Sequence, residues 1–128
     1  MAIIRSFRDL NAYKTARQEA QKIFLRTRHF PPEERYSLTD QTRRSSRAVK
    51  AMIAEAWARR RYQAVFINKI DEALGEATET QSWLDDCLDC SYISPAEFKQ
   101  MDAAWQSIGA MLNKMIVRAD DFCRKSES

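Results

Sequence analysis

The residues of this sequence best suited to bind a ligand are the cations between positions 43 and 61. At about 100° per residue of a helix, Arg43, Arg47, Lys50 and Arg61 point within an arc of about 60°. Guanidinium groups neutralise phosphates, and a neighbouring indole offers a face on which an unpaired base stacks. The pattern predicts a nucleic-acid-binding face, with these candidates: Arg43, Arg44, Arg47, Lys50, Trp57, Arg59, Arg60 and Arg61.

A second interpretation of the same residues remains open. The cations could form a solvated helix face, with Trp57 buried in a contact between subunits. Residues 1–61 hold 15 Lys and Arg against 6 Asp and Glu, whereas residues 62–128 hold 6 against 12. Such asymmetry indicates either a polyanion that binds the first half or pairing between unlike surfaces of neighbouring subunits. The density of arginine favours the anion.

Residues with catalytic or metal-binding capacity are few and poorly spaced. Cys87 and Cys90 form a CxxC pair, but a zinc site normally needs four ligands, and His29 is the only histidine. A redox CxxC usually opens a helix beside a βαβ unit, whereas this pair ends a helix. The aspartates within residues 85–89 lack the glycine turn of a calcium loop. We therefore expect structural cysteines, no metal, no cofactor and no enzymatic activity.

The elements that carry these residues are predicted to be helices. Two glycines and three prolines in 128 residues leave too few turn residues for an all-β chain, and good helix formers dominate. Apolar residues recur at three- and four-residue steps over four segments. These predict helices over residues 9–28, 38–60, 63–89 and 95–123.

Local signals set the ends of these helices. Pro31-Pro32 stops the first, and Ser37 or Thr39 can cap the second. Ser94, followed by Pro95 and by Glu97, has the pattern of a capping box at the start of the fourth. In the third, Gly75 is costly for a helix interior, so we expect another backbone to approach it closely.

Four helices with short links predict a single domain over residues 1–128, an antiparallel up-down-up-down four-helix bundle. The fourth helix has a heptad seam over 101–122 that is apolar across a wide arc. No apolar run approaches the roughly 18–20 residues of a membrane span, and the first residues lack a secretory core. Together with an odd count of three cysteines, this predicts a cytoplasmic protein.

Residues spread over about positions 7–117 stand in a characteristic order and spacing: Phe7, Asp9, Leu10, Tyr13, Ala16, Phe30, Pro31, Glu34, Tyr36, Leu38, Gln41, Arg43, Arg44, Ser45, Ile53, Ala54, Glu55, Ala73, Gly75, Glu79, Leu112 and Ile116. In these residues the sequence resembles a known family, the four-helix-bundle proteins encoded in 23S ribosomal RNA intervening sequences. The chain departs from the family pattern at Met52 and Ala56, where Asn and Gly are usual, and at Glu76, where Ser is usual.

The resemblance implies a ring-like homo-oligomer, commonly a pentamer. A related branch is the accessory variability determinant of diversity-generating retroelements, a basic pentamer that engages nucleic acid and a reverse transcriptase. We therefore expect a homo-oligomer that binds RNA or single-stranded DNA, with a protein such as a reverse transcriptase as a further partner. The alternative is an adaptor for another protein, in which the arginines serve subunit contacts.

Overall fold

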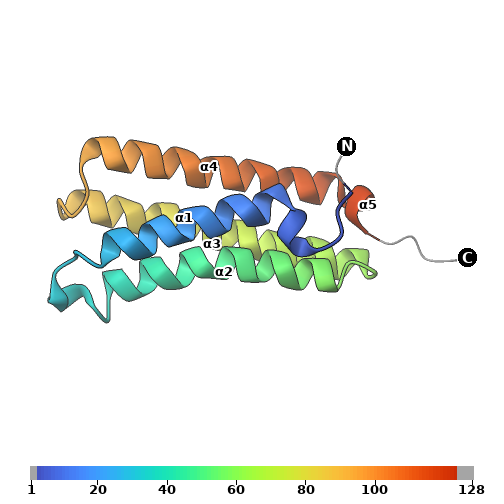
Figure 1. The fold of residues 1–128 in the computed structure, drawn as a ribbon, viewed down its shortest axis with the longest axis horizontal. Coiled ribbons are helices and arrows are strands. Elements are labelled where there is room, and N and C mark those ends of the chain that lie inside the picture. The colour runs from blue at the N-terminus through green and yellow to red at the C-terminus, as the bar shows by residue number, and fades with distance from the viewer. Residues whose placement is uncertain (1–2, 124–128) are drawn as a thin grey trace, which may run out of the picture.

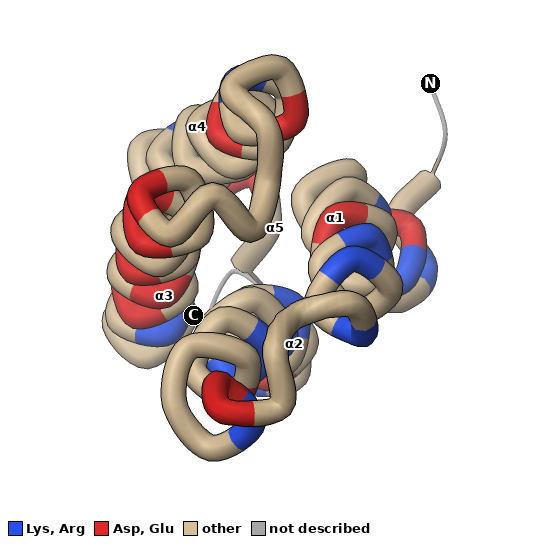
Figure 2. The backbone as a smooth tube through the Cα atoms, turned by 90° about the vertical axis from the view of Figure 1, so that its left-hand side faces the viewer, with Lys and Arg blue, Asp and Glu red and all other residues tan. Residues whose placement is uncertain are grey.

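The structure is a computed structural model that describes residues 3–123. Four long helices alternate in direction and lie around a common core (Figures 1 and 2), and the described residues contain no strand. The all-α bundle predicted from the sequence is thereby confirmed. Its elements are η1 (Phe7–Asp9), α1 (Asn11–Thr27), η2 (Pro32–Glu34), α2 (Leu38–Ala58), α3 (Gln63–Asp89), α4 (Pro95–Val117) and α5 (Ala119–Phe122).

The start of α4 follows the predicted capping box. The Glu97 amide donates to Ser94 Oγ at 3.1 Å, and the Glu97 carboxylate accepts from the Ser94 amide at 3.0 Å. Two amide protons that a helix start leaves without partners are satisfied in this way. The first helix differs from the prediction: a 3₁₀ turn capped by Ser6 occupies residues 7–9, and α1 begins at Asn11.

The fourth helix is shorter than predicted. It ends at Val117, and Arg118, with φ −106° and ψ 33°, separates it from α5. The short α5 turns away from the axis of α4 (Figure 1) and places the Phe122 ring 6.0 Å from that of Phe66 on α3. The predicted continuous helix over 95–123 is therefore wrong, because packing over the end of α3 outweighs helical continuity.

The core consists of aromatic and branched side chains from all four long helices. Trp105 and Phe66 are fully buried, together with Ile23, Ile53, Ile70, Leu84, Ile108 and Leu112. Between α2 and α3 two of the buried residues are small and polar: Ser45 and Thr80 share a hydrogen bond of 2.8 Å between their hydroxyl oxygens. Small side chains let these two helices approach closely, and the hydrogen bond offsets the cost of burying hydroxyl groups.

Gly75 has no close neighbour in the described bundle. A Cβ atom built on it would meet no other heavy atom within 4 Å, apart from those of its own helical turn and chain neighbours. The expectation that another backbone of the bundle approaches Gly75 is therefore wrong, since the glycine faces away from the other helices.

Candidate nucleic-acid interface

Positively and negatively charged side chains lie mainly on different helices. Lys and Arg gather on α1 and α2, whereas Asp and Glu line α3 (Figure 2). Within its bounds α3 carries one lysine and seven carboxylates, while α2 carries four cations and two carboxylates. The sequence-level asymmetry thus becomes a basic side, formed by α1 and α2, and an acidic side on α3.

Arg43 and Arg47 meet a residue of α1 across the junction between α1 and α2. Their guanidinium carbons lie 4.7 and 5.0 Å from the centroid of the Phe24 ring. Arg43 also donates through Nε to Thr27 Oγ1 at 2.8 Å, and that hydroxyl donates to the Ile23 carbonyl at 2.8 Å. Cation–π attraction and this hydrogen bond therefore hold two positive charges side by side.

Two shallow hollows flank this arrangement. One, of about 230 Å³, is lined by Arg17, Ala20, Gln21, Arg47 and Lys50. The other, of about 240 Å³, lies at the end of α1 and is lined by Thr27, Arg28, Phe30, Pro31, Pro32, Arg35, Thr39 and Arg43. No lining residue of either hollow is acidic. We call the six cations along this junction the basic seam: Arg17, Arg28, Arg35, Arg43, Arg47 and Lys50.

Arg44 lies outside the basic seam. It forms ion pairs with Glu76, at 3.3 Å, and with Glu79, both on α3. The hydrogen bonds that Arg44 donates to these two carboxylates raise the pKa of Arg44, and the bond to Glu76 has the larger effect. Burial raises the pKa of Glu76 in spite of the arginine. Among the predicted residues, Arg44 therefore joins α2 to the acidic side, where its charge is already compensated.

The other predicted residues lie at the far end of α2. Trp57 is half-buried and packs against the core, and the Arg60 guanidinium carbon lies 3.9 Å from the centroid of its ring. Arg60 also donates to the Trp57 carbonyl at 2.8 Å. Arg59 is exposed at the helix end, and Arg61 lies over the ring of Tyr62 at 4.9 Å. The structure therefore divides the eight candidates into three groups rather than one stripe.

Three cations of the basic seam are absent from the candidates that the sequence of α2 supplies: Arg17, Arg28 and Arg35. A signal exists in the sequence, because Arg17, Phe24 and Arg28 lie within about 60° of one another on a helical projection of the first helix. The apolar periodicity of that helix places Phe24 in the core stripe. The ring is instead only partly buried, between α1 and the two arginines of α2.

Cys87 has the surroundings of a structural residue. Cys87 is buried, and this burial raises its thiol pKa to about 12, although a hydrogen bond with Thr42 opposes the shift. Cys90 is exposed, and all three cysteines are free thiols. A raised pKa leaves little thiolate for nucleophilic or metal-binding chemistry. Within the described part of the chain, no group of three or more His, Cys, Asp or Glu side chains could hold a metal ion.

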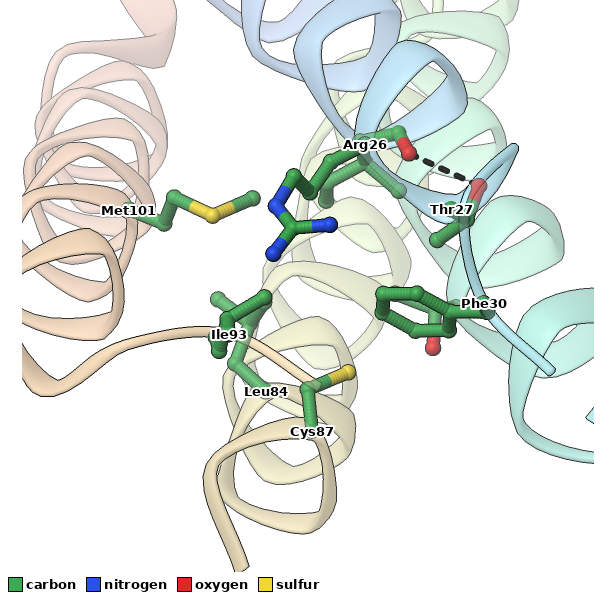
Figure 3. Close-up of a pocket in the computed structure, with 9 residues that line it drawn as sticks. Arg26, Thr27, Phe30, Leu84, Cys87, Ile93 and Met101 are labelled. Carbon is green, nitrogen blue, oxygen red and sulfur yellow. Dashed lines mark hydrogen bonds between the residues drawn. The ribbon is translucent and has the colours of Figure 1, made fainter. Parts of the chain in front are cut away.

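The pocket beside Cys87 is too small for a substrate. Its volume is about 10 Å³, and Figure 3 shows Arg26, Cys87 and Met101 among the side chains around it. Such a space holds at most about one water molecule. His29 is exposed beyond the end of α1. No helix among residues 3–123 is long and apolar enough to cross a membrane.

Comparison with known proteins supports the resemblance seen in the sequence. Residues 8–114 match the model of the 23S rRNA-intervening sequence protein family. A solved structure from Bacteroides thetaiotaomicron, described as a protein of unknown function from the S23 ribosomal protein family, has a TM-score of 0.75 at 26% identity. The match covers 83% of this chain and 95% of that chain. No curated protein matches.

Proposed function

The chain belongs to the 23S rRNA-intervening sequence protein family. We propose, from its basic seam, that it is a non-enzymatic protein that binds RNA or single-stranded DNA. One observation carries the proposal. Arg43 and Arg47 are held together on Phe24, and no lining residue of the hollows on either side is acidic. A polyanion would find prepositioned cations there, without having to displace a carboxylate.

The energetics favour phosphate rather than base recognition. Arg43 and Arg47 are separated by one helical turn, about 6 Å along the axis, and Lys50 follows about 4.5 Å further. Cations spaced along a helix in this way neutralise successive phosphates and release condensed counterions. Binding is therefore mainly electrostatic and depends strongly on salt. Arg59, Arg60 and Arg61 at the end of α2 would extend the contact, whereas Arg44 would contribute little because of its ion pairs.

We further propose that the protein acts as a homo-oligomer, with five subunits as the resemblance implies. A head-to-tail ring pairs two different surfaces of each subunit. The acidic side of α3 and the basic side of α1 and α2 are suitable partners for such pairing. If the basic seam itself lay in that contact, the protein would serve as an adaptor for another protein, and this is the second candidate function.

The test removes three charges from the basic seam in one variant. Glutamine at Arg43, Arg47 and Lys50 keeps helix propensity and most of each side-chain stem. A control variant carries glutamine at Lys99, Lys114 and Arg118, which are exposed on or next to α4, so that the net charge falls equally. Binding of a labelled single-stranded oligonucleotide is measured by fluorescence anisotropy at several salt concentrations.

The seam variant should bind more weakly and with a flatter salt dependence, since removing one neutralised phosphate lowers the log–log slope by about 0.7 for single strands. The control should keep the wild-type slope. The proposal fails if wild type does not bind at low salt, or if both triple variants lose affinity equally. Disassembly of the seam variant into monomers would instead support the adaptor.

A further inference from the structure

The turn before α2 exposes an aromatic ring at one end of the basic seam. Tyr36 is 83% exposed, although it is a large side chain within the short connection between η2 and α2. A single exposed apolar residue is ordinary on a protein surface. Tyr36 is set apart by the hydrogen bonds that fix its turn and by its neighbour Arg35.

The turn that carries Tyr36 is fixed by hydrogen bonds on both sides of it. The Ser37 amide donates to the Glu34 carbonyl at 3.0 Å, and Ser37 Oγ donates to the Glu34 carboxylate at 2.6 Å. The same carboxylate accepts from the hydroxyl of Tyr92, in the loop before α4, at 2.9 Å. The backbone of Tyr36 is thus held in place before any ligand arrives, which lowers the entropic cost of binding.

Arg35 connects the exposed ring to the basic seam. Its guanidinium carbon lies 5.3 Å from the centroid of the Tyr36 ring, and the same residue lines the hollow that contains Arg28 and Arg43. A ring beside a phosphate-binding hollow suits one nucleotide, because the base can stack on the tyrosine while its phosphate reaches the arginines. Only an unpaired base can stack in this way, since the bases of a duplex are stacked on each other.

We infer that Tyr36 is a base-stacking platform at the end of the basic seam and that it makes the protein prefer single-stranded to double-stranded nucleic acid. The inference rests on the proposed function and names the substrate class within it. The ring of Trp57, by contrast, is half-buried, and the guanidinium carbon of Arg60 lies 3.9 Å from its centroid, closer than Arg35 lies to the Tyr36 ring. Tyr36 therefore presents the more accessible aromatic surface.

The chain offers a matched control for this residue. Tyr62 is also exposed, at 56%, and also lies beside the guanidinium of a preceding arginine, Arg61. It stands at the opposite end of α2, and its neighbour Arg61 lines neither hollow of the basic seam, whereas Arg35 lines one of them. Tyr36→Ala and Tyr62→Ala therefore remove the same chemistry from two positions that differ in their distance from the seam.

The experiment compares a labelled single strand of about 20 nucleotides, enough to span one site, with the corresponding duplex, by anisotropy at fixed low salt and in a salt series. Tyr36→Ala should weaken single-strand binding by about 5- to 150-fold, the effect of losing one stacked base. Duplex binding should change less than about twofold, because paired bases do not stack on the ring. The salt slope should stay that of wild type, because every phosphate keeps its cation. Tyr36→Trp should restore single-strand affinity. Tyr62→Ala should weaken single-strand binding much less than Tyr36→Ala does, because Tyr62 lies beside Arg61 at the edge of the contact.

The outcomes separate this inference from the proposed function. If wild type binds and the seam variant loses binding, but Tyr36→Ala affects neither probe or weakens both equally, the inference alone is overturned. Dissociation of the oligomer in Tyr36→Ala would also overturn it, because the ring would then serve a protein contact. Absence of any wild-type binding at low salt overturns the proposed function together with the inference.

Discussion

The guanidinium carbon of Arg47 lies 5.0 Å from the centroid of the Phe24 ring, so that a cation of α2 rests on an aromatic side chain of α1. This contact joins α1 to α2. The charge pattern of either helix alone does not predict it. The contact also explains why Phe24, which follows the buried Ile23, is only partly buried. The ring supports the basic seam instead of filling the core.

Replacing Phe24 by leucine should therefore weaken nucleic-acid binding and leave the fold intact. Leucine keeps an apolar side chain but removes the ring face on which Arg43 and Arg47 rest. Loss of an exposed cation–π interaction, about 0.5–1 kcal/mol, corresponds to a two- to fivefold loss of affinity. Anisotropy titration measures this effect. Phe24→Tyr, which keeps the ring, should bind like wild type, and equal affinity of the leucine variant would show that the ring is dispensable.

Gly75→Ala should stabilise the protein. Alanine is preferred to glycine by about 0.8–1.0 kcal/mol in a helix interior, and a Cβ at this position meets no neighbouring side chain or backbone within 4 Å. Urea unfolding followed by circular dichroism should show a higher midpoint with an unchanged slope. A loss of stability that accompanies dissociation of the oligomer would contradict this, and it would show that a neighbouring subunit covers Gly75.

The ion pair between Arg26 and Glu97 should make the free energy of unfolding depend on pH in the acidic range. The Arg26 side chain, and then the Ser94 amide, lower the pKa of Glu97 to about 2. Because this pKa is lowered on folding, the stabilisation is complete above the ordinary carboxyl pKa near 4.5 and is lost as the pH falls toward 2.

Glu97→Gln keeps the capping pattern and removes the charge. It should lower the free energy of unfolding at pH 7 by about 0.5–1 kcal/mol, a small value because the glutamate side chain is 40% exposed. Urea unfolding at about pH 7, 4 and 2.5 should show the difference from wild type shrinking with acidity. A difference that stays constant with pH would mean that the ion pair does not contribute.

Replacement of Cys87 and Cys90 by alanine should lower the free energy of unfolding by about 1–3 kcal/mol, through lost packing of the buried Cys87.

In the native wild type, Cys90 should react with iodoacetamide much faster than Cys87, whose thiol pKa is raised to about 12 by burial. Mass spectrometry of the alkylated peptides measures both rates. Stoichiometric zinc in protein purified without added metal, absent from the double variant, would refute the structural role.

Light scattering at micromolar concentration should give several times the 14.9 kDa mass of one chain, with five subunits as the expected number. If the acidic side of α3 pairs with the basic side of α1 and α2, high salt should lower this mass, because exposed charges are screened. A monomer at every concentration would exclude the ring. The charge separation would then require another explanation, such as the polyanion alone.

The sequence by itself determined the helices and their order in the bundle. The bounds of α3 coincide with the predicted residues 63–89, and the start of α4 coincides with its capping box. These features depend on contacts between residues a few positions apart, which a linear sequence displays directly. The family, too, was recognisable from residues spread over most of the chain, and the match over residues 8–114 confirms it.

Only the tertiary structure decided which cations act together. Arg44 and Arg47 are one turn apart on α2, yet one pairs with carboxylates of α3 and the other lies on Phe24 of α1. The break at Arg118 and the open surroundings of Gly75 likewise depend on what the other helices place nearby. A helical projection gives the direction of a side chain from its own axis. The side chain's partner is set by the position of the adjacent helix, which results from packing of the whole core.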